Sequence, residues 1–222
     1  MKIKDILVRY AVATLGLVLV ALGVALSLKS NLGTAPASCP PAVLHLRWTA
    51  LSVGTFTWIM HLVLILGQMA LKRKVFEWNY LLQLAAAFVF GYLCDAWIWL
   101  IRDVQVPSYA MQLVYSLLTV LVTAVGIRLE VIGNAWILAG DQSVVVLAEV
   151  CGRKFSNVKI AFDIFLVILS AGFAFAVFGT PFGDGNAVVI REGTVILALF
   201  TGACMKLTDP LVDKLFKPVL HE

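Results

Sequence analysis

The sequence predicts an all-α integral membrane protein with six transmembrane helices, arranged as a 3+3 inverted repeat. Of its 222 residues, 61% are hydrophobic and 14% are charged, with a mean hydropathy of +0.96, whereas soluble domains carry about a quarter charged residues. The apolar residues form blocks of the ~20 residues that a helix needs to cross a bilayer. The two halves, about 7–102 and about 110–209, share a pattern in which an interrupted or re-entrant short helix follows the first span. We expect one integral membrane domain, residues 1–222.

Six apolar segments are predicted to span the membrane. The first is too long for a signal peptide, lacks a small-residue cleavage pattern and is followed by further spans. Basic residues gather at both termini, in KRK after the second span and in GRKFSNVK before the fifth. The positive-inside rule therefore predicts a multi-pass protein of the cell inner (cytoplasmic) membrane with both termini in the cytoplasm. The spans are residues 7–28, 52–71, 79–101, 110–131, 157–179 and 190–208.

The internal repeat is found by aligning Gly23 with Gly126. Residues 17–44 then match the apolar pattern of residues 118–147, and the chain is interrupted at the same place in both. Three spans per half make the second half enter the membrane from the opposite side, so the repeat is inverted. Chance similarity between apolar stretches is the alternative explanation.

The two interrupted segments, residues 29–50 and 132–151, indicate where a functional site lies. Non-helical backbone at membrane depth is tolerated only where protein or water covers it. Paired interrupted segments in an inverted repeat are typical of a transport site near the midplane of the bilayer. Alternatively, both segments are ordinary apolar surface loops.

Two stretches resemble a known family. RYAVATLGLVLVALGVALSLKSNLGTAP (residues 9–36) and LSVGTF (residues 51–56) are similar to the YczE/YitT-like bacterial membrane proteins, which are largely uncharacterised. TAPASCPP departs from related chains, which often have an aromatic or acidic residue after the proline. The resemblance implies a small multi-pass membrane protein and no established reaction.

The polar residues of the two interruptions are the candidate substrate-binding residues. Ser38 is expected to cap a short helix, while Pro40 and Pro41 remove two of the N–H groups that a helix N-terminus offers to an anion. Asp141 is expected to cap the second short helix and to add a negative charge, with plain capping as the alternative. These features favour a cation, a proton-coupled solute or a neutral polar solute. The candidates are Asn31, Ser38, Cys39, Asn134, Asp141, Gln142 and Ser143.

Three polar residues within the spans are candidates for a proton or ion relay: His61, Asp95 and Asp163. A charged group at bilayer depth costs about 2.5–3.5 kcal/mol on insertion scales and usually faces the protein interior. The alternatives are a hydrogen-bonded packing role for His61 and a bond to a neighbouring helix for Asp95. Arg128 and Glu130, near the end of the fourth span, are expected at the membrane interface.

Several functions are excluded by missing motifs. The sequence has no HExxH, GxSxG, P-loop or dinucleotide fingerprint, so we expect no enzyme. Its four cysteines are scattered without a CxxC and it has only three histidines, so we expect no metal site and no cofactor. The basic residues follow the cytoplasmic rim of the membrane, which argues against a nucleic-acid partner.

Two functions remain. The first is a secondary transporter or channel-like carrier of a small polar or cationic solute, with proton coupling as an option, whose site lies between the interrupted segments. The second is a non-transporting membrane partner, either a ligand-capturing subunit or a scaffold of a larger membrane complex. The expected partners are the lipid bilayer and a small-molecule or ion substrate, with a second copy of the chain or another subunit as further options.

Overall fold

The structure is a computed structural model. It describes residues 3–72, 78–133, 135, 138–153, 155–183 and 188–221. Within these ranges the regular structure is helical apart from one isolated β-bridge, which confirms the predicted all-α class. The helices are α1 (Ile3–Ser30), η1 (Pro36–Ser38, a 3₁₀ turn), α2 (Cys39–Arg47), α3 (Val53–Lys72), α4 (Trp78–Leu100), α5 (Tyr109–Gly133), α6 (Ala139–Cys151), α7 (Phe155–Phe178) and α8 (Glu192–His221).

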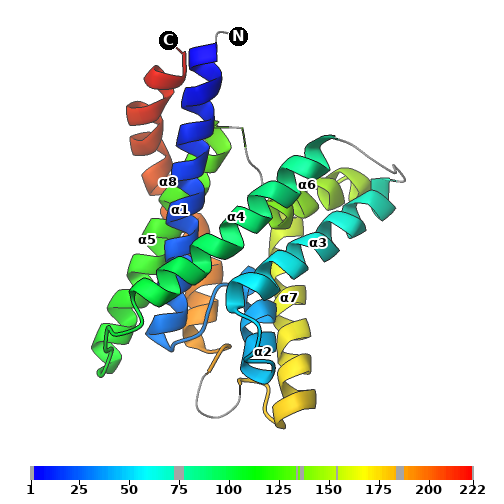
Figure 1. The fold of residues 1–222 in the computed structure, drawn as a ribbon, viewed down its shortest axis with the longest axis vertical. Coiled ribbons are helices and arrows are strands. Elements are labelled where there is room, and N and C mark those ends of the chain that lie inside the picture. The colour runs from blue at the N-terminus through cyan, green and yellow to red at the C-terminus, as the bar shows by residue number, and fades with distance from the viewer. Residues whose placement is uncertain are drawn as a thin grey trace.

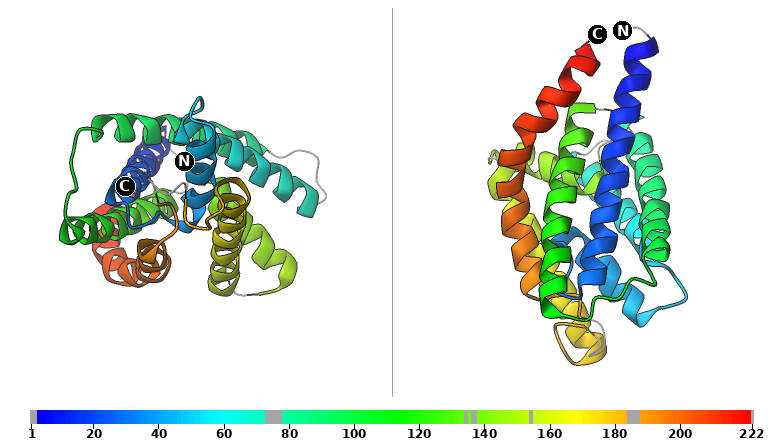
Figure 2. Two further views of the ribbon diagram at one scale, coloured as in Figure 1. Left: turned by 90° about the horizontal axis from the view of Figure 1, so that it is seen from below. Right: turned by 90° about the vertical axis from the view of Figure 1, so that its left-hand side faces the viewer.

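The long helices run between two ends of the molecule. Figures 1 and 2 show the N- and C-terminal ends side by side at one end. At the opposite end α4 and α7 finish and α5 and α8 begin. Five of the described helices are long and apolar enough to cross a membrane, and a sixth is obtained if the two segments of α8 form one span. A multi-pass membrane protein is therefore plausible from the structure as well as from the sequence.

Helix α8 extends beyond the predicted end of the sixth span at residue 208. Its segments Glu192–Met205 and Leu207–Phe216 meet at an angle of 49°. Pro210 explains the bend, because it has no N–H to bond the carbonyl one turn earlier and its ring crowds that carbonyl. Thr208 adds to the bend by donating its Oγ1 hydrogen to the carbonyl of Cys204 at 3.1 Å.

Helices α1 and α5 form the closest long-helix pair, and glycines line their contact. A Cβ placed on Gly126 would lie 2.8 Å from Cγ2 of Val20 and 2.9 Å from the carbonyl oxygen of Gly16. A Cβ placed on Gly23 would collide with Oγ1 of Thr123. Such small residues let backbones approach where lipid provides no hydrophobic drive between helices.

The two short helices lie within the interrupted segments predicted from the sequence. Both α2 and α6 pack against α3 and α7, so one pair of long helices holds them both. Leu138, directly before α6, packs with Leu17 and Phe90, which lie at the middle of α1 and α4. Helix α6 therefore begins deep inside the molecule. Cys39, the first residue of α2, is also fully buried.

Candidate functional site

Three charged side chains meet where α6 begins against α7. Nζ of Lys159 lies 3.0 Å from Oδ1 of Asp163 and 3.4 Å from Oδ1 of Asp141. Lys159 and Asp163 are one turn apart on α7, the spacing at which helical side chains meet. The Asp141–Lys159–Asp163 cluster has a formal charge of −1. It joins two aspartates that the sequence placed in different roles. Lys159 enters the sequence analysis only as part of the basic segment GRKFSNVK, although its i,i+4 spacing to Asp163 inside an apolar span points to a pair.

Asp141 reaches this cluster from the first turn of α6 and does not cap the helix. The N-cap position is Leu138, and no side chain caps the end. The predicted capping role of Asp141 is therefore wrong. A carboxylate in the first turn is still stabilised by the helix dipole, and here its oxygen also faces the ammonium group of Lys159.

Two further polar residues are buried inside the molecule. His61 on α3 and Glu130 on α5 are 4% and 5% exposed. Nδ1 of His61 and Oε1 of Glu130 have no hydrogen-bond partner among the described residues. Glu130 was expected at the interface, but Gly16 lets it enter the interior: a Cβ on that glycine would lie 2.9 Å from Cγ of Glu130. The interior of the molecule therefore holds two further groups able to carry a proton.

A buried amide network fixes the start of α6. Nε2 of Gln68 donates to Oε1 of Gln83 and to Oγ of Ser143, both at 3.0 Å, and lies 3.2 Å from the carbonyl oxygen of Ala139. Ser143 in turn donates to that carbonyl. Ser143, a candidate binding residue, thus helps to position α6 against α3 and α4. Gln142 lies outside the network and is half-buried.

The sequence analysis missed Gln68 and Gln83. Both are more than nine-tenths buried, and each is a neutral polar residue inside an apolar span. Such residues often hydrogen-bond across membrane helices. That pattern was the available signal, but only the structure shows that the two amides meet each other.

The start of α2 packs against α7 further along that helix. Ser38 occupies the N-cap position but makes no capping hydrogen bond, contrary to expectation. Its neighbour Cys39 is fully buried and donates from Sγ to the carbonyl of Thr34 at 3.6 Å. Cys39 shares a buried apolar cluster with Ala174 of α7, whereas Asp141 reaches Lys159 near the start of that helix. Helix α7 therefore packs against both short helices, at different points along its length.

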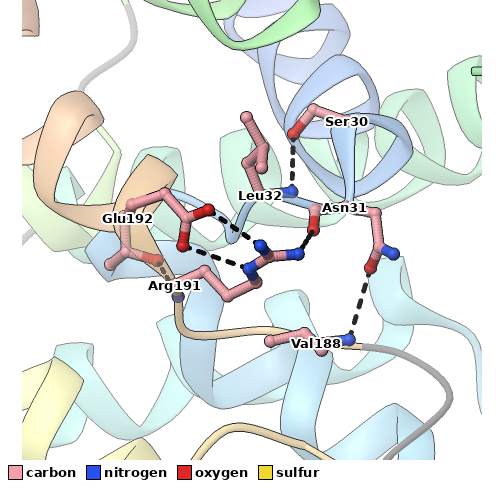
Figure 3. A network of polar contacts seen from close by, with 7 residues as sticks. Ser30, Asn31, Leu32, Val188, Arg191 and Glu192 are labelled. Atoms are coloured by element: carbon pink, nitrogen blue, oxygen red, sulfur yellow. Dashed lines mark hydrogen bonds and ion pairs between the residues drawn. The ribbon is translucent and has the colours of Figure 1, made fainter. Parts of the chain in front are cut away.

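Asn31 lies at the end of α1, in a separate polar network (Figure 3). Nη1 of Arg191 donates to the backbone carbonyl of Asn31 at 3.2 Å, and the N–H of Val188 donates to its Oδ1 at 3.4 Å. Arg191 also pairs with Glu192 at 2.8 Å. These contacts tie the end of α1 to the start of α8. Asn134, its partner in the repeat, lies outside the described residues.

Asp95 is likewise separate from the cluster and holds the start of α3. Its carboxylate accepts hydrogen bonds from Oγ of Ser52 and, at 2.8 Å, from the N–H of Gly54. Ser52 also caps α3 by accepting from the N–H of Thr55 at 3.0 Å. The bond to a neighbouring helix, weighed as the alternative for Asp95, is the one seen. The described residues contain no group of three or more His, Cys, Asp or Glu side chains placed to hold a metal ion.

A known family covers most of the chain. Residues 7–210 match DUF6198, a family of unknown function. The chain belongs to this family. The matched part of this DUF6198 protein includes the whole Asp141–Lys159–Asp163 cluster and both short helices. The family description makes no link to YczE/YitT-like proteins. No curated protein and no solved structure matches the chain.

Proposed function

We propose that this DUF6198 protein is a secondary transporter or channel-like carrier of a small polar or cationic solute. Its site is the Asp141–Lys159–Asp163 cluster at α7, the helix against which both short helices α2 and α6 pack. One observation carries the proposal: Lys159 of α7 bridges Asp163 on its own helix and Asp141 in the first turn of the short helix α6. Transporters with discontinuous helices place substrate and coupling ions between such helix ends.

The glycine contacts support the inverted repeat on which this reading rests. The alignment that places Gly23 on Gly126 also places Val20 on Thr123. In the structure Gly23 faces Thr123, and Gly126 faces Val20. A two-fold axis relating the halves produces such an exchange of partners. Re-entry of α6 is supported by Leu138, which packs against the middle of α1 and α4.

The charges at the site favour a cation over an anion. The cluster has one more carboxylate than ammonium groups, so an anion would be repelled. At the start of α2, Pro40 and Pro41 supply no N–H donors, which weakens the usual attraction of a helix N-terminus for anions. Buried His61 and Glu130 are the groups we assign to proton coupling.

The decisive experiment measures flux into liposomes that contain only this purified protein. The solutes are alkali metal ions, ammonium and small primary amines, each tested with and without a pH gradient. We expect uptake of at least one of them, and its loss in Asp163→Asn. Asp103→Asn is the matched control, because that side chain is 89% exposed and lies in the α4–α5 connection. Full flux in Asp163→Asn would show that the cluster is not the site.

A non-transporting membrane partner is the second candidate, and the surface of α7 favours it. In the most apolar 18-residue stretch of α7, only 17% is buried inside the molecule, against 50% in the corresponding stretch of α1. Its outward residues Ile160, Ile164 and Ile168 follow one helix face and are all exposed, which suits contact with another membrane helix. On this reading the purified chain moves no solute and is recovered from its native membrane with a second subunit or a second copy after crosslinking.

A further inference from the structure

A groove runs along the outer surface where α6 and α7 meet, distinct from the charged cluster. It has a volume of about 670 Å³. Its wall is apolar and is built from Leu147, Val158, Ala161, Phe162 and Phe165. Among the five long helices that could each cross a membrane, α7 has the smallest buried share in its most apolar stretch. The groove therefore opens onto surface that lipid would cover.

One end of the groove is polar and cationic. Helix α6 ends at Cys151 and is capped by Gly152, whose φ of 60° is left-handed. The next N–H, that of Arg153, donates to the carbonyl of Ala148 at 3.1 Å. This glycine turn places Arg153 beside Cys151 and Asn157 at the groove. Arg153 is exposed and has no ion pair among the described residues.

We propose that this groove binds an anionic phospholipid, with an acyl chain along the apolar wall and the phosphate group at Arg153. A soluble phosphate would leave the apolar wall unused, and a zwitterionic phospholipid such as phosphatidylcholine would bring its own cationic head group next to the guanidinium. Basic pockets between membrane helices on the cytoplasmic side are suited to anionic head groups. The N-terminal turn of α7, which supplies Asn157 and Val158, adds N–H groups and a positive dipole end near the same position.

The groove shares both its helices with the charged cluster. Val158 and Phe162, which line it, directly precede Lys159 and Asp163 on α7. A lipid between α6 and α7 therefore stabilises the helix spacing at which Lys159 reaches Asp141. This effect on the cluster rests on the proposed function, whereas lipid binding itself does not.

The test measures lipid binding without any transport assay. Purified protein in neutral detergent is titrated with phosphatidylglycerol or phosphatidylcholine, and the thermal unfolding midpoint is recorded. We expect phosphatidylglycerol to raise the midpoint several degrees more than phosphatidylcholine. Arg153→Gln should abolish this difference, while Arg47→Gln, an exposed arginine on α2, should keep it.

A second readout uses Cys151, an exposed free cysteine that lines the groove. In a Cys204→Ser background, phosphatidylglycerol should slow maleimide labelling of Cys151 several-fold relative to phosphatidylcholine. Ala161→Trp, which fills the groove, should remove that protection, whereas Ala176→Trp, on exposed α7 surface outside it, should not. Equal effects of the two lipids, or an unchanged preference in Arg153→Gln, would overturn the proposal and leave only non-specific surrounding lipid.

Discussion

Lys159 is a tethered cation held between two carboxylates. Methionine keeps the length of the side chain and removes its charge, so Lys159→Met leaves Asp141 and Asp163 to repel each other. Like charges about 4 Å apart interact by roughly 1–4 kcal/mol between bulk water and a protein surface. We expect a lower unfolding midpoint, restored when ammonium or an alkali cation is added, because the solute then replaces the missing ammonium group. Thermal unfolding over a salt series measures this.

The matched control for that variant is Lys29→Met. Nζ of Lys29 donates to the carbonyl of Arg102 at 2.6 Å, at the end of α1 and away from any carboxylate pair. Its unfolding midpoint should show no specific response to small cations. If both variants respond to salt alike, the cluster does not bind cations.

A second prediction at the scale of single residues concerns the effect of replacing Gln68 on stability. Gln68→Leu keeps the approximate volume but leaves Oε1 of Gln83 without the donor that it has in the structure. A buried polar group that loses its partner costs about 1–3 kcal/mol, so we expect a clear loss of thermal stability. Gln142→Leu, on the same site but outside the network, should have a much smaller effect. Equal unfolding midpoints for the two variants would show that the network does not hold α6.

What the sequence predicts for single residues depends on whether their partners are local. The special character of Asp141 was visible from its place before an apolar run, but its partner Lys159 lies on another helix. The burial of Glu130 depends on Gly16, on α1. No local pattern in the sequence carries either contact, which explains why a capping aspartate and an interfacial glutamate were predicted.

Among the helices, the α1–α5 contact makes the sharpest prediction. Gly23→Leu and Gly126→Leu should each destabilise the protein, because the new side chain meets Thr123 in one case and Val20 with the Gly16 backbone in the other. Overpacking of this kind costs about 1–3 kcal/mol or more.

Gly172→Leu on α7 is the control for both glycine variants, since no atom lies within 4 Å of its added Cβ. Leucine is favoured over glycine in a helix by roughly 1 kcal/mol, so this variant should be neutral or slightly stabilising. Thermal unfolding in detergent compares the three. A loss of stability confined to Gly172→Leu would contradict the packing of α1 on α5.

The helices themselves were largely predictable. Blocks of apolar residues predict the positions of the long helices, and the interruptions that contain proline and glycine predict where the short helices lie. Both patterns can be read from the sequence because they are local along the chain. The sixth span was predicted to end at residue 208, but α8 continues to His221. The part of α8 just beyond residue 208 is held by Arg128, whose guanidinium pairs with Asp213 and lies 3.8 Å from Asp209. This long-range ion pair makes a helix of a segment that looks like a polar tail.

For the whole molecule, orientation in the membrane is the prediction that the transport proposal needs most. Three spans per half place both termini and the α6–α7 turn on one side of the membrane and the α4–α5 connection on the other. The basic residues predict that the side with the termini is cytoplasmic. The structure places the two termini together, with the α4–α5 connection at the opposite end (Figure 2).

Single-cysteine labelling tests this orientation. In a background with Cys151→Ser and Cys204→Ser, which leaves only the buried Cys39 and Cys94, one exposed position is changed to cysteine on each side. Asp103→Cys, in the α4–α5 connection, should react with an impermeant maleimide in intact cells. Arg153→Cys, in the α6–α7 turn, should react only after the membrane is permeabilised. Labelling of both positions in intact cells would place the two short helices on the same side of the membrane and contradict the inverted repeat.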